Sequence, residues 1–316
     1  MSFSGLAERA GSRWFSLLLG LVLLVALALQ LDVHRLGELL TGVNGLLLAV
    51  AFLFYFVSYL LRALRWLLLL GEGLGLVEWL HIVVLHTVAN NLLPFRSGEL
   101  SFPYFCKTLY GISLDDSIAA LLSARVADLF SLGLVGCVAL VFVGVMSPWM
   151  LLGILLVPAC FVLVRFSERL VSFLSRTVFK RDVRIEAISP VRFLLLFFAS
   201  LLIWFVKFFS FYLMVLSFGK SLGLGYWQVV VASIASEVAA ALPIQSLAEF
   251  GLFEAGWAGP LMAMGIDRHL AVTLGFAVHL TFLLFSVVMG IPVYALTIIR
   301  WRSSRGEDKG GACRVR

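Results

Sequence analysis

Two amides, a proline, an arginine and a glutamate occur together in the stretch NNLLPFRSGE, residues 90–99, within otherwise almost unbroken apolar sequence. Pro94 removes a backbone donor and disturbs a helix, and ionisable side chains are costly inside a bilayer. Arg96 suits phosphate, because its planar guanidinium donates two hydrogen bonds at once. Glu99 shares a helical face with Arg96. The stretch predicts a site that handles a polar group at membrane depth, or an ion pair that closes the tip of an interfacial hairpin.

Further ionisable side chains lie inside apolar segments. A charge at the centre of a transmembrane helix costs about 2.5 to 3.5 kcal/mol, so these groups should face one another or a hydrated cavity. Arg125 and Asp128 are three residues apart and either neutralise each other or bind a substrate. Lys207 is ambiguous, because its long stem can reach the interface. The candidate substrate-binding residues are Asn90, Asn91, Arg96, Glu99, Arg125, Asp128, Glu237, Glu249, Glu254 and His279.

A weak internal repeat relates two interrupted regions. Leu93-Pro94 is followed 17 residues later by Gly111-Ile112, and Leu242-Pro243 is followed 22 residues later by Gly265-Ile266. A count of 14 residues from each glycine reaches a basic side chain, Arg125 in the first case and His279 in the second. Weak internal symmetry of this kind is typical of transporters. We therefore expect repeat units at about 46–164 and 193–299.

The elements that must position these residues are membrane helices. The chain has 316 residues, 62% of them apolar and only 13% charged, with a mean hydropathy of +1.05, far outside the soluble globular range. We predict an all-α polytopic membrane protein, with about six full transmembrane helices and two re-entrant helical hairpins in an inverted repeat. The expected spans lie near residues 15–31, 46–61, 118–145, 149–164, 193–218 and 270–299, and the hairpins near 76–105 and 227–263.

Basic residues set the expected orientation. Residues 165–192 hold seven Lys and Arg, and residues 300–316 hold six, so both segments should be cytoplasmic and attract anionic lipid. Residues 165–184 fit either a short interfacial helix or an ordinary basic loop. We expect one transmembrane domain over residues 1–300, a basic cytoplasmic tail at 301–316, and a cytoplasmic N-terminus in the cell (inner) membrane. We interpret the first apolar run, residues 15–31, as an uncleaved helix rather than a signal peptide, because it is longer than the usual apolar core of a signal peptide.

Several partners and chemistries are not expected. The positive charge is concentrated in loops, so it indicates membrane orientation and no nucleic-acid partner. The four cysteines lack metal-ligand spacing, and no GxxxxGK[ST] loop is present, so we expect no metal and no cofactor. The longest polar loop is too short for a soluble catalytic domain, so we do not expect an enzyme.

The chain resembles the flippase-like family that includes the transmembrane region of lysylphosphatidylglycerol synthases, with stand-alone relatives. The resemblance extends from about residue 12 to 300. It rests on residues 90–99, on Gly111-Ile112-Ser113 with Arg125 and Asp128, and on Gly251-Leu252-Phe253-Glu254 with Gly265-Ile266. It implies a protein that moves a lipid or lipid-linked substrate between leaflets, with the headgroup bound between the two re-entrant units. The alternative is a non-catalytic membrane subunit that assists a lipid-modifying synthase or glycosyltransferase as its partner.

Overall fold

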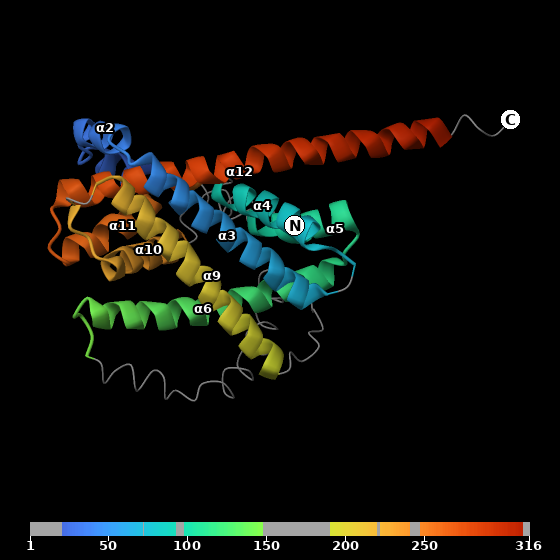
Figure 1. The fold of residues 1–316 in the computed structure, drawn as a ribbon, viewed down its shortest axis with the longest axis horizontal. Coiled ribbons are helices and arrows are strands. Elements are labelled where there is room, and N and C mark those ends of the chain that lie inside the picture. Colours follow the sequence, from blue (N-terminus) through green and yellow to red (C-terminus); the bar gives the residue numbers. More distant parts are fainter. Residues whose placement is uncertain are drawn as a thin grey trace, which may run out of the picture.

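The computed structural model describes residues 21–71, 73–92, 98–147, 190–219, 222–240 and 247–311, with side chains as far as residue 298. These residues form helices and no strand, which confirms the predicted all-α class (Figure 1). The helices are α2 (Val33–Thr41), α3 (Gly45–Leu70), α4 (Leu76–Leu92), α5 (Ser101–Tyr110), α6 (Leu114–Phe142), α9 (Pro190–Ser217), α10 (Tyr226–Ala240), η3 (Leu247–Glu249), α11 (Leu252–Ala263) and α12 (Arg268–Gly311).

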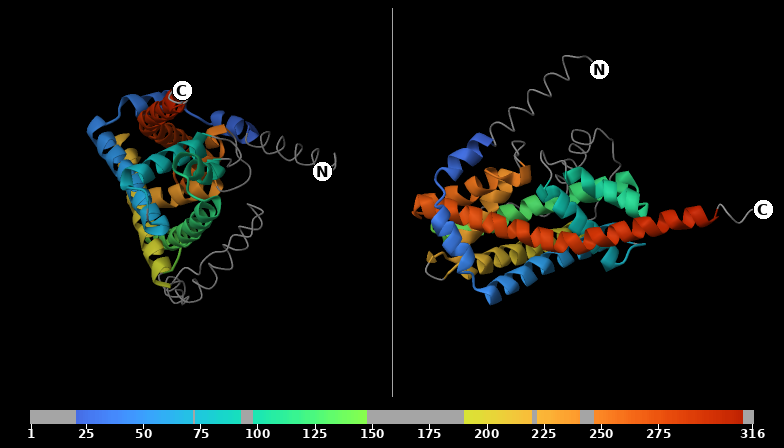
Figure 2. Two further views of the ribbon diagram at one scale, coloured as in Figure 1. Left: turned by 90° about the vertical axis from the view of Figure 1, so that its right-hand side faces the viewer. Right: turned by 90° about the horizontal axis from the view of Figure 1, so that it is seen from above.

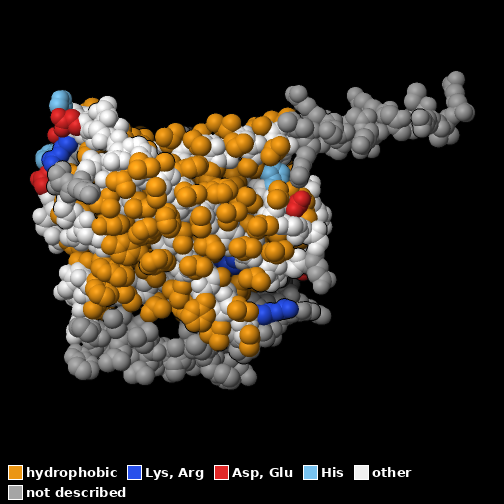
Figure 3. Space-filling model, viewed as in Figure 1, with side chains coloured by type: hydrophobic (Ala, Val, Ile, Leu, Met, Phe, Trp, Pro, Cys, Tyr) orange, Lys and Arg blue, Asp and Glu red, His pale blue; other side chains and the backbone are white. Residues whose placement is uncertain are grey.

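Four helices are long and apolar enough to cross a membrane. They are α3, α6, α9 and residues 268–298 of α12, and they coincide with four of the six expected spans. The expected span at 149–164 and the first part of the span at 15–31 lie outside the described residues. Hydrophobic side chains cover most of the described face in Figure 3, while charged groups gather near its edges. An apolar exterior of this kind suits contact with lipid, and the chain is a multi-pass membrane protein.

Two short helices occupy the interrupted regions. α4 has 17 residues and α10 has 15, so each is roughly 22 to 26 Å long, shorter than the ~30 Å hydrocarbon core. Each is followed by a further short helix, α5 or α11, and then by a long one. The order long, short, short, long therefore occurs twice, as α3-α4-α5-α6 and α9-α10-α11-α12.

Glycine allows each short pair to pack at close range. A Cβ on Gly98 would lie 2.2 Å from the Cα of Asn90 at the end of α4, and a Cβ on Gly256 would lie 2.4 Å from the Cα of Ser236 on α10. Any other residue would force these backbones apart. In both regions a glycine thus allows the segment after the first short helix to pack directly against that helix.

The long helices of the two series run in opposite directions. The backbone N–H of Asn44, just before α3, donates to the carbonyl of Ser217 at the end of α9 (2.9 Å), and α3 and α9 lie side by side along their lengths in Figure 1. The Asn44 side chain caps α3 by accepting from the N–H of Leu47 (3.1 Å). The antiparallel α3–α9 pair forms one face of the bundle (Figure 2).

α12 extends along the bundle and beyond it (Figure 2). Its 44 residues correspond to roughly 66 Å. It touches α4 at two levels. At Gly290 of α12 the helices are so close that an added Cβ would lie 3.0 Å from Val88 Cγ2 of α4. Further along, Thr297 Oγ1 of α12 is hydrogen-bonded to His81 Nε2 of α4 (2.7 Å). α12 therefore belongs to one series of helices and packs against the other.

Candidate functional site

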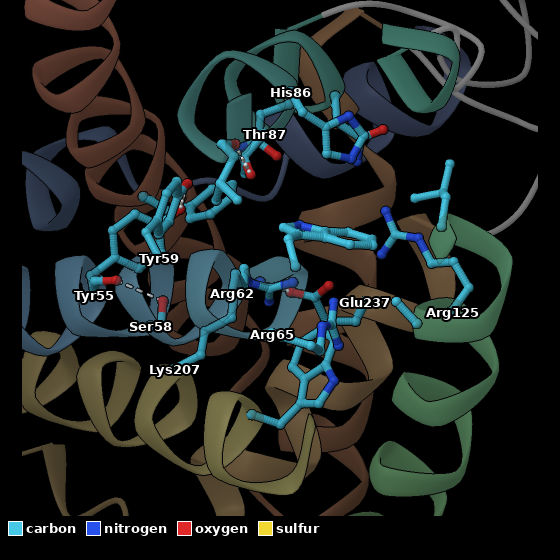
Figure 4. A pocket seen from close by; sticks show the side chains of 18 residues that line it. Tyr55, Ser58, Tyr59, Arg62, Arg65, His86, Thr87, Arg125, Lys207 and Glu237 are labelled. Carbon is cyan, nitrogen blue, oxygen red and sulfur yellow. Dashed lines mark hydrogen bonds and ion pairs between the residues drawn. The ribbon is translucent and has the colours of Figure 1, made fainter. Parts of the chain in front are cut away.

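A polar cavity of about 80 Å³ lies where α3, α4, α6, α9, α10 and α12 meet. Its lining includes residues from the middle of the long helices, among them Arg125 of α6, Lys207 of α9 and Phe282 of α12. Figure 4 shows the charged side chains of Arg62, Arg125, Lys207 and Glu237 directed toward this space. At ~10–15 Å³ for each water-sized probe, the cavity holds several waters or a small polar group. Its position among apolar helices makes it a candidate binding site inside the helix bundle.

A buried ion pair supports one wall of the cavity. Arg65 Nη1 donates to Asp128 Oδ1 (2.6 Å) and to Ser200 Oγ (2.8 Å), and both charged side chains are almost fully buried. The indole Nε1 of Trp204 also donates to Asp128 Oδ1 (3.2 Å). Asp128 therefore connects α3, α6 and α9. A buried carboxylate requires such partners, because an isolated charge in a low-dielectric interior is very costly.

A second ion pair lies at the edge of the cavity and is partly exposed. Arg125 donates to Glu99 through two nitrogens on one edge of its guanidinium, Nη2 to Oε1 (2.7 Å) and Nε to Oε2 (3.3 Å). The two side chains are 36% and 23% exposed. Arg125 Nη1 is 3.9 Å from Asp128 Oδ2, so the expected pairing three residues along the helix is the weaker contact. Arg125 therefore has a planar, two-point carboxylate partner and access to solvent.

A third ion pair joins α9 to α10. The Lys207 ammonium contacts Glu237 Oε1, and Trp204 lies nearby with its ring centroid 5.0 Å from Lys207 Nζ. Glu237 is in the last turn of α10, where the helix dipole disfavours a carboxylate, so a cation stabilises it. Both residues line the cavity.

Arg62 is the cavity cation without a carboxylate partner. Arg65, Arg125 and Lys207 each have one, whereas no carboxylate among the described residues comes within 4.0 Å of Arg62. Its guanidinium instead stacks on Trp204, 5.2 Å from the ring centroid, and it lines the cavity in a half-buried position. Arg62 therefore has donors available for an anionic ligand.

Amide and hydroxyl groups form the opposite wall. Tyr55 hydrogen-bonds to Tyr59 (2.9 Å) and Ser286 (3.3 Å), and Asn91 Nδ2 donates to Ser286 Oγ (3.0 Å). Asn90 Oδ1 is buried and has no hydrogen-bond partner among the described residues. An acceptor of this kind can take a hydrogen bond from a ligand hydroxyl or a water. The cavity thus offers cationic donors on one side and neutral polar groups on the other.

Glu254 and His279 pair elsewhere, inside the protein core. Glu254 Oε1 is 2.7 Å from His279 Nδ1, and Oε2 accepts from the N–H of Gly251 (2.6 Å). Both side chains are fully buried. The imidazole stacks on Phe253, with ring centroids 4.3 Å apart, and its Nε2 has no hydrogen-bond partner among the described residues. This pair fixes the start of α11 against α12.

The structure distributes the ten predicted residues over several places. Asn90, Asn91, Arg125 and Glu237 line the cavity, and Glu99 and Asp128 contact cations that line it. Glu254 and His279 do not line it. Glu249 lies on η3 with a φ of 62° and is not among the lining residues. Arg96, with its flanks from 93 to 97, lies outside the described residues, as does most of the segment 165–192.

The sequence interpretation missed Arg62 and Arg65 as site residues. The expected span ended near residue 61, just before these arginines, but α3 continues to Leu70. The i, i+3 spacing of the two arginines was the available signal, because it places both on one helical face. Trp204 was also missed, and nothing in its local sequence distinguishes it from other aromatic residues of α9.

The protein family described as the lysylphosphatidylglycerol synthase TM region matches residues 13–302. The search of curated proteins found no match.

Proposed function

Because this chain belongs to the lysylphosphatidylglycerol synthase transmembrane-region family, we propose that it binds the phosphate-bearing headgroup of a membrane lipid, or of a lipid-linked molecule, and moves it between leaflets. The headgroup occupies the cavity between α3, α4, α6, α9, α10 and α12. The acyl or polyprenyl chain stays in the surrounding hydrocarbon. The protein resides in the cell (inner) membrane with both termini cytoplasmic.

Arg62 is the observation that carries this proposal. A guanidinium near mid-membrane is expensive unless it is neutralised, and Arg62 has no carboxylate within 4.0 Å among the described residues. A phosphate group would neutralise it through two parallel hydrogen bonds. Arg65, Arg125 and Lys207 are each balanced by a carboxylate, so among the described residues Arg62 gives the cavity its net positive charge. An anionic headgroup is therefore the ligand that this lining stabilises best.

We further propose that the two helix series form an inverted repeat around this cavity. In this arrangement α4 and α5 re-enter from the cytoplasmic side, and α10 and α11 from the outside. Opposed re-entrant units can open a central site to each side in turn. The Arg125–Glu99 ion pair joins the first hairpin to α6. An entering phosphate could displace the Glu99 carboxylate from Arg125.

Reconstitution into liposomes tests the proposal. Purified parent protein should increase the transbilayer exchange of a fluorescent phosphatidylglycerol or a fluorescent polyprenyl phosphate, read by dithionite quenching. Arg62→Gln should lower that rate about tenfold or more, because a hydrogen bond to a charged group contributes roughly 1.5–3 kcal/mol. Arg35→Gln is the matched control, because Arg35 lies on α2 and does not line the cavity.

Two outcomes would contradict the proposal. If folded parent protein leaves the exchange of both probes unchanged, with and without an ion gradient, the chain is better explained as an accessory subunit of a lipid-modifying enzyme. If Arg62→Gln transports as fast as Arg35→Gln, the cavity is not the binding site.

A further inference from the structure

Three aromatic rings and one carboxylate surround the ammonium group of Lys207. Its Nζ lies 5.0 Å from the ring centroid of Trp204, 5.4 Å from that of Phe211 and 5.5 Å from that of Phe282. The carboxylate of Glu237 completes the set by an ion pair. Aromatic faces combined with a carboxylate are the surroundings in which proteins bind ammonium groups of ligands. In this protein the occupant of the cation site is a side chain of the chain itself.

This cation site is held in place by contacts beyond Lys207. The Trp204 indole is fixed by its hydrogen bond to Asp128 (3.2 Å). Phe211 is fully buried, and it packs edge-on against Phe282 with ring centroids 5.9 Å apart. The rings therefore present their faces without help from a ligand. Removal of the lysine side chain alone would leave a preformed site for another ammonium group.

No other carboxylate of the described cavity is open to a ligand cation. Both oxygens of Glu99 accept from the Arg125 guanidinium, and Asp128 accepts from Arg65 and from the Trp204 indole. A headgroup amine would have to displace one of these groups or approach the positive charge of Lys207. In contrast, an anion meets the available guanidinium of Arg62.

We infer that Lys207 determines the specificity of the cavity: by occupying the cation site of Glu237, Trp204, Phe211 and Phe282, it excludes headgroups that carry an amine. The ligand is then a phosphate-bearing lipid without an ammonium group, and any further polar groups are hydroxyls that meet the amide and hydroxyl wall. This inference rests on the proposed function, because it assigns the headgroup class for the same cavity.

Competition binding in detergent tests the inference. A fluorescent phosphatidylglycerol is displaced from the purified protein by short-chain phosphatidylglycerol, by short-chain phosphatidylethanolamine and by a short polyprenyl phosphate. The parent should bind phosphatidylglycerol at least about tenfold more tightly than phosphatidylethanolamine, because juxtaposed like charges are strongly unfavourable. The polyprenyl arm distinguishes a lipid-linked phosphate from a phospholipid, and tighter binding of either amine-free probe supports the inference.

Lys207→Gln should create a site for the amine. It frees Glu237 and the three rings, so the ratio of the phosphatidylethanolamine and phosphatidylglycerol dissociation constants should fall at least about fivefold, as expected for a desolvated cation–π site with a carboxylate. The double variant Lys207→Gln, Glu237→Gln removes the carboxylate as well and should regain part of the discrimination. Lys107→Gln changes an exposed lysine away from the cavity and should leave the ratio as in the parent.

The outcomes separate the two proposals. If the parent binds both phospholipids equally, the specificity assignment fails while the cavity remains a lipid site. The assignment also fails if folded Lys207→Gln binds phosphatidylglycerol with an unchanged ratio. If the parent binds none of the three probes, the proposed function itself fails. The parent measurement needs no variant, so misfolding of Lys207→Gln does not prevent the test.

Discussion

The two short-helix regions place an acid–base pair at nearly the same sequence offset, yet the environments of the pairs differ. Glu99 contacts Arg125 across 26 residues, and Glu254 contacts His279 across 25. The first pair is 23% and 36% exposed at the cavity edge, whereas the second is completely buried. Similar local frameworks thus hold a partly exposed ion pair in one region and a dry, ring-stacked pair in the other. We expect binding to depend on the first pair and folding on the second.

The largest expected effect is on stability and follows from Glu254→Ala. The substitution leaves the buried His279 Nδ1 and the Gly251 N–H without their partner. We expect a loss of about 3 kcal/mol, in the range for breaking a buried polar pair, measured as a lower apparent Tm in detergent. Glu254→Gln keeps an oxygen for the Gly251 N–H and should cost clearly less. An unchanged Tm for Glu254→Ala would show that the dry pair is not structural.

Next in size is a substitution that should affect both regions alike. Gly98→Ala places a Cβ 2.2 Å from the Cα of Asn90, and Gly256→Ala places one 2.4 Å from the Cα of Ser236. Overpacking of this kind costs about 1–3 kcal/mol, so both variants should lower the apparent Tm by similar amounts. Gly133→Ala is the control, because no heavy atom lies within 4 Å of its Cβ position. A large effect in one region only would mean that the hairpins are not equivalent.

The smallest effect on stability is expected for Glu99→Gln. The pair with Arg125 is partly exposed, and pairs of this kind contribute about 1 kcal/mol or less. The apparent Tm should therefore change little, while the salt dependence of fluorescent phosphatidylglycerol binding should change, because Arg125 loses its bidentate partner. If Glu99→Gln lowers the Tm as much as Glu254→Ala and leaves lipid binding as in the parent, the contrast between the regions is wrong.

Much of the backbone arrangement was predictable, because long apolar runs have few alternatives to membrane helices. Four expected spans coincide with α3, α6, α9 and α12. The two glycines that mark the internal repeat lie in turns that require positive φ, 72° at Gly111 and 85° at Gly265. Local chemistry of this kind is visible in sequence because it depends on neighbouring residues alone.

The partners of the buried charges were not predictable. Asp128 was expected either to pair with Arg125 one turn away or to bind a substrate, but its close contact is Arg65 (2.6 Å), 63 positions earlier in the chain. Which cation reaches a carboxylate depends on how α3 crosses α6 and α9, and no local spacing encodes that crossing. Glu254 illustrates the same point, because its burial depends on α11 packing against α12.

The length of α12 has a mechanical consequence. α12 is continuous over roughly 66 Å, with Pro292 in its interior, and a tilt of about 5° of the helix as one rod about its start would displace its far end by roughly 6 Å. Because this rod also touches α4 at Val88 and His81, such a tilt would press on the first hairpin while the second hairpin stays near the pivot. In such a tilt α12 would act as a lever, and the displacement of its far end would be large enough to measure between a spin label at that end and a second label on α3.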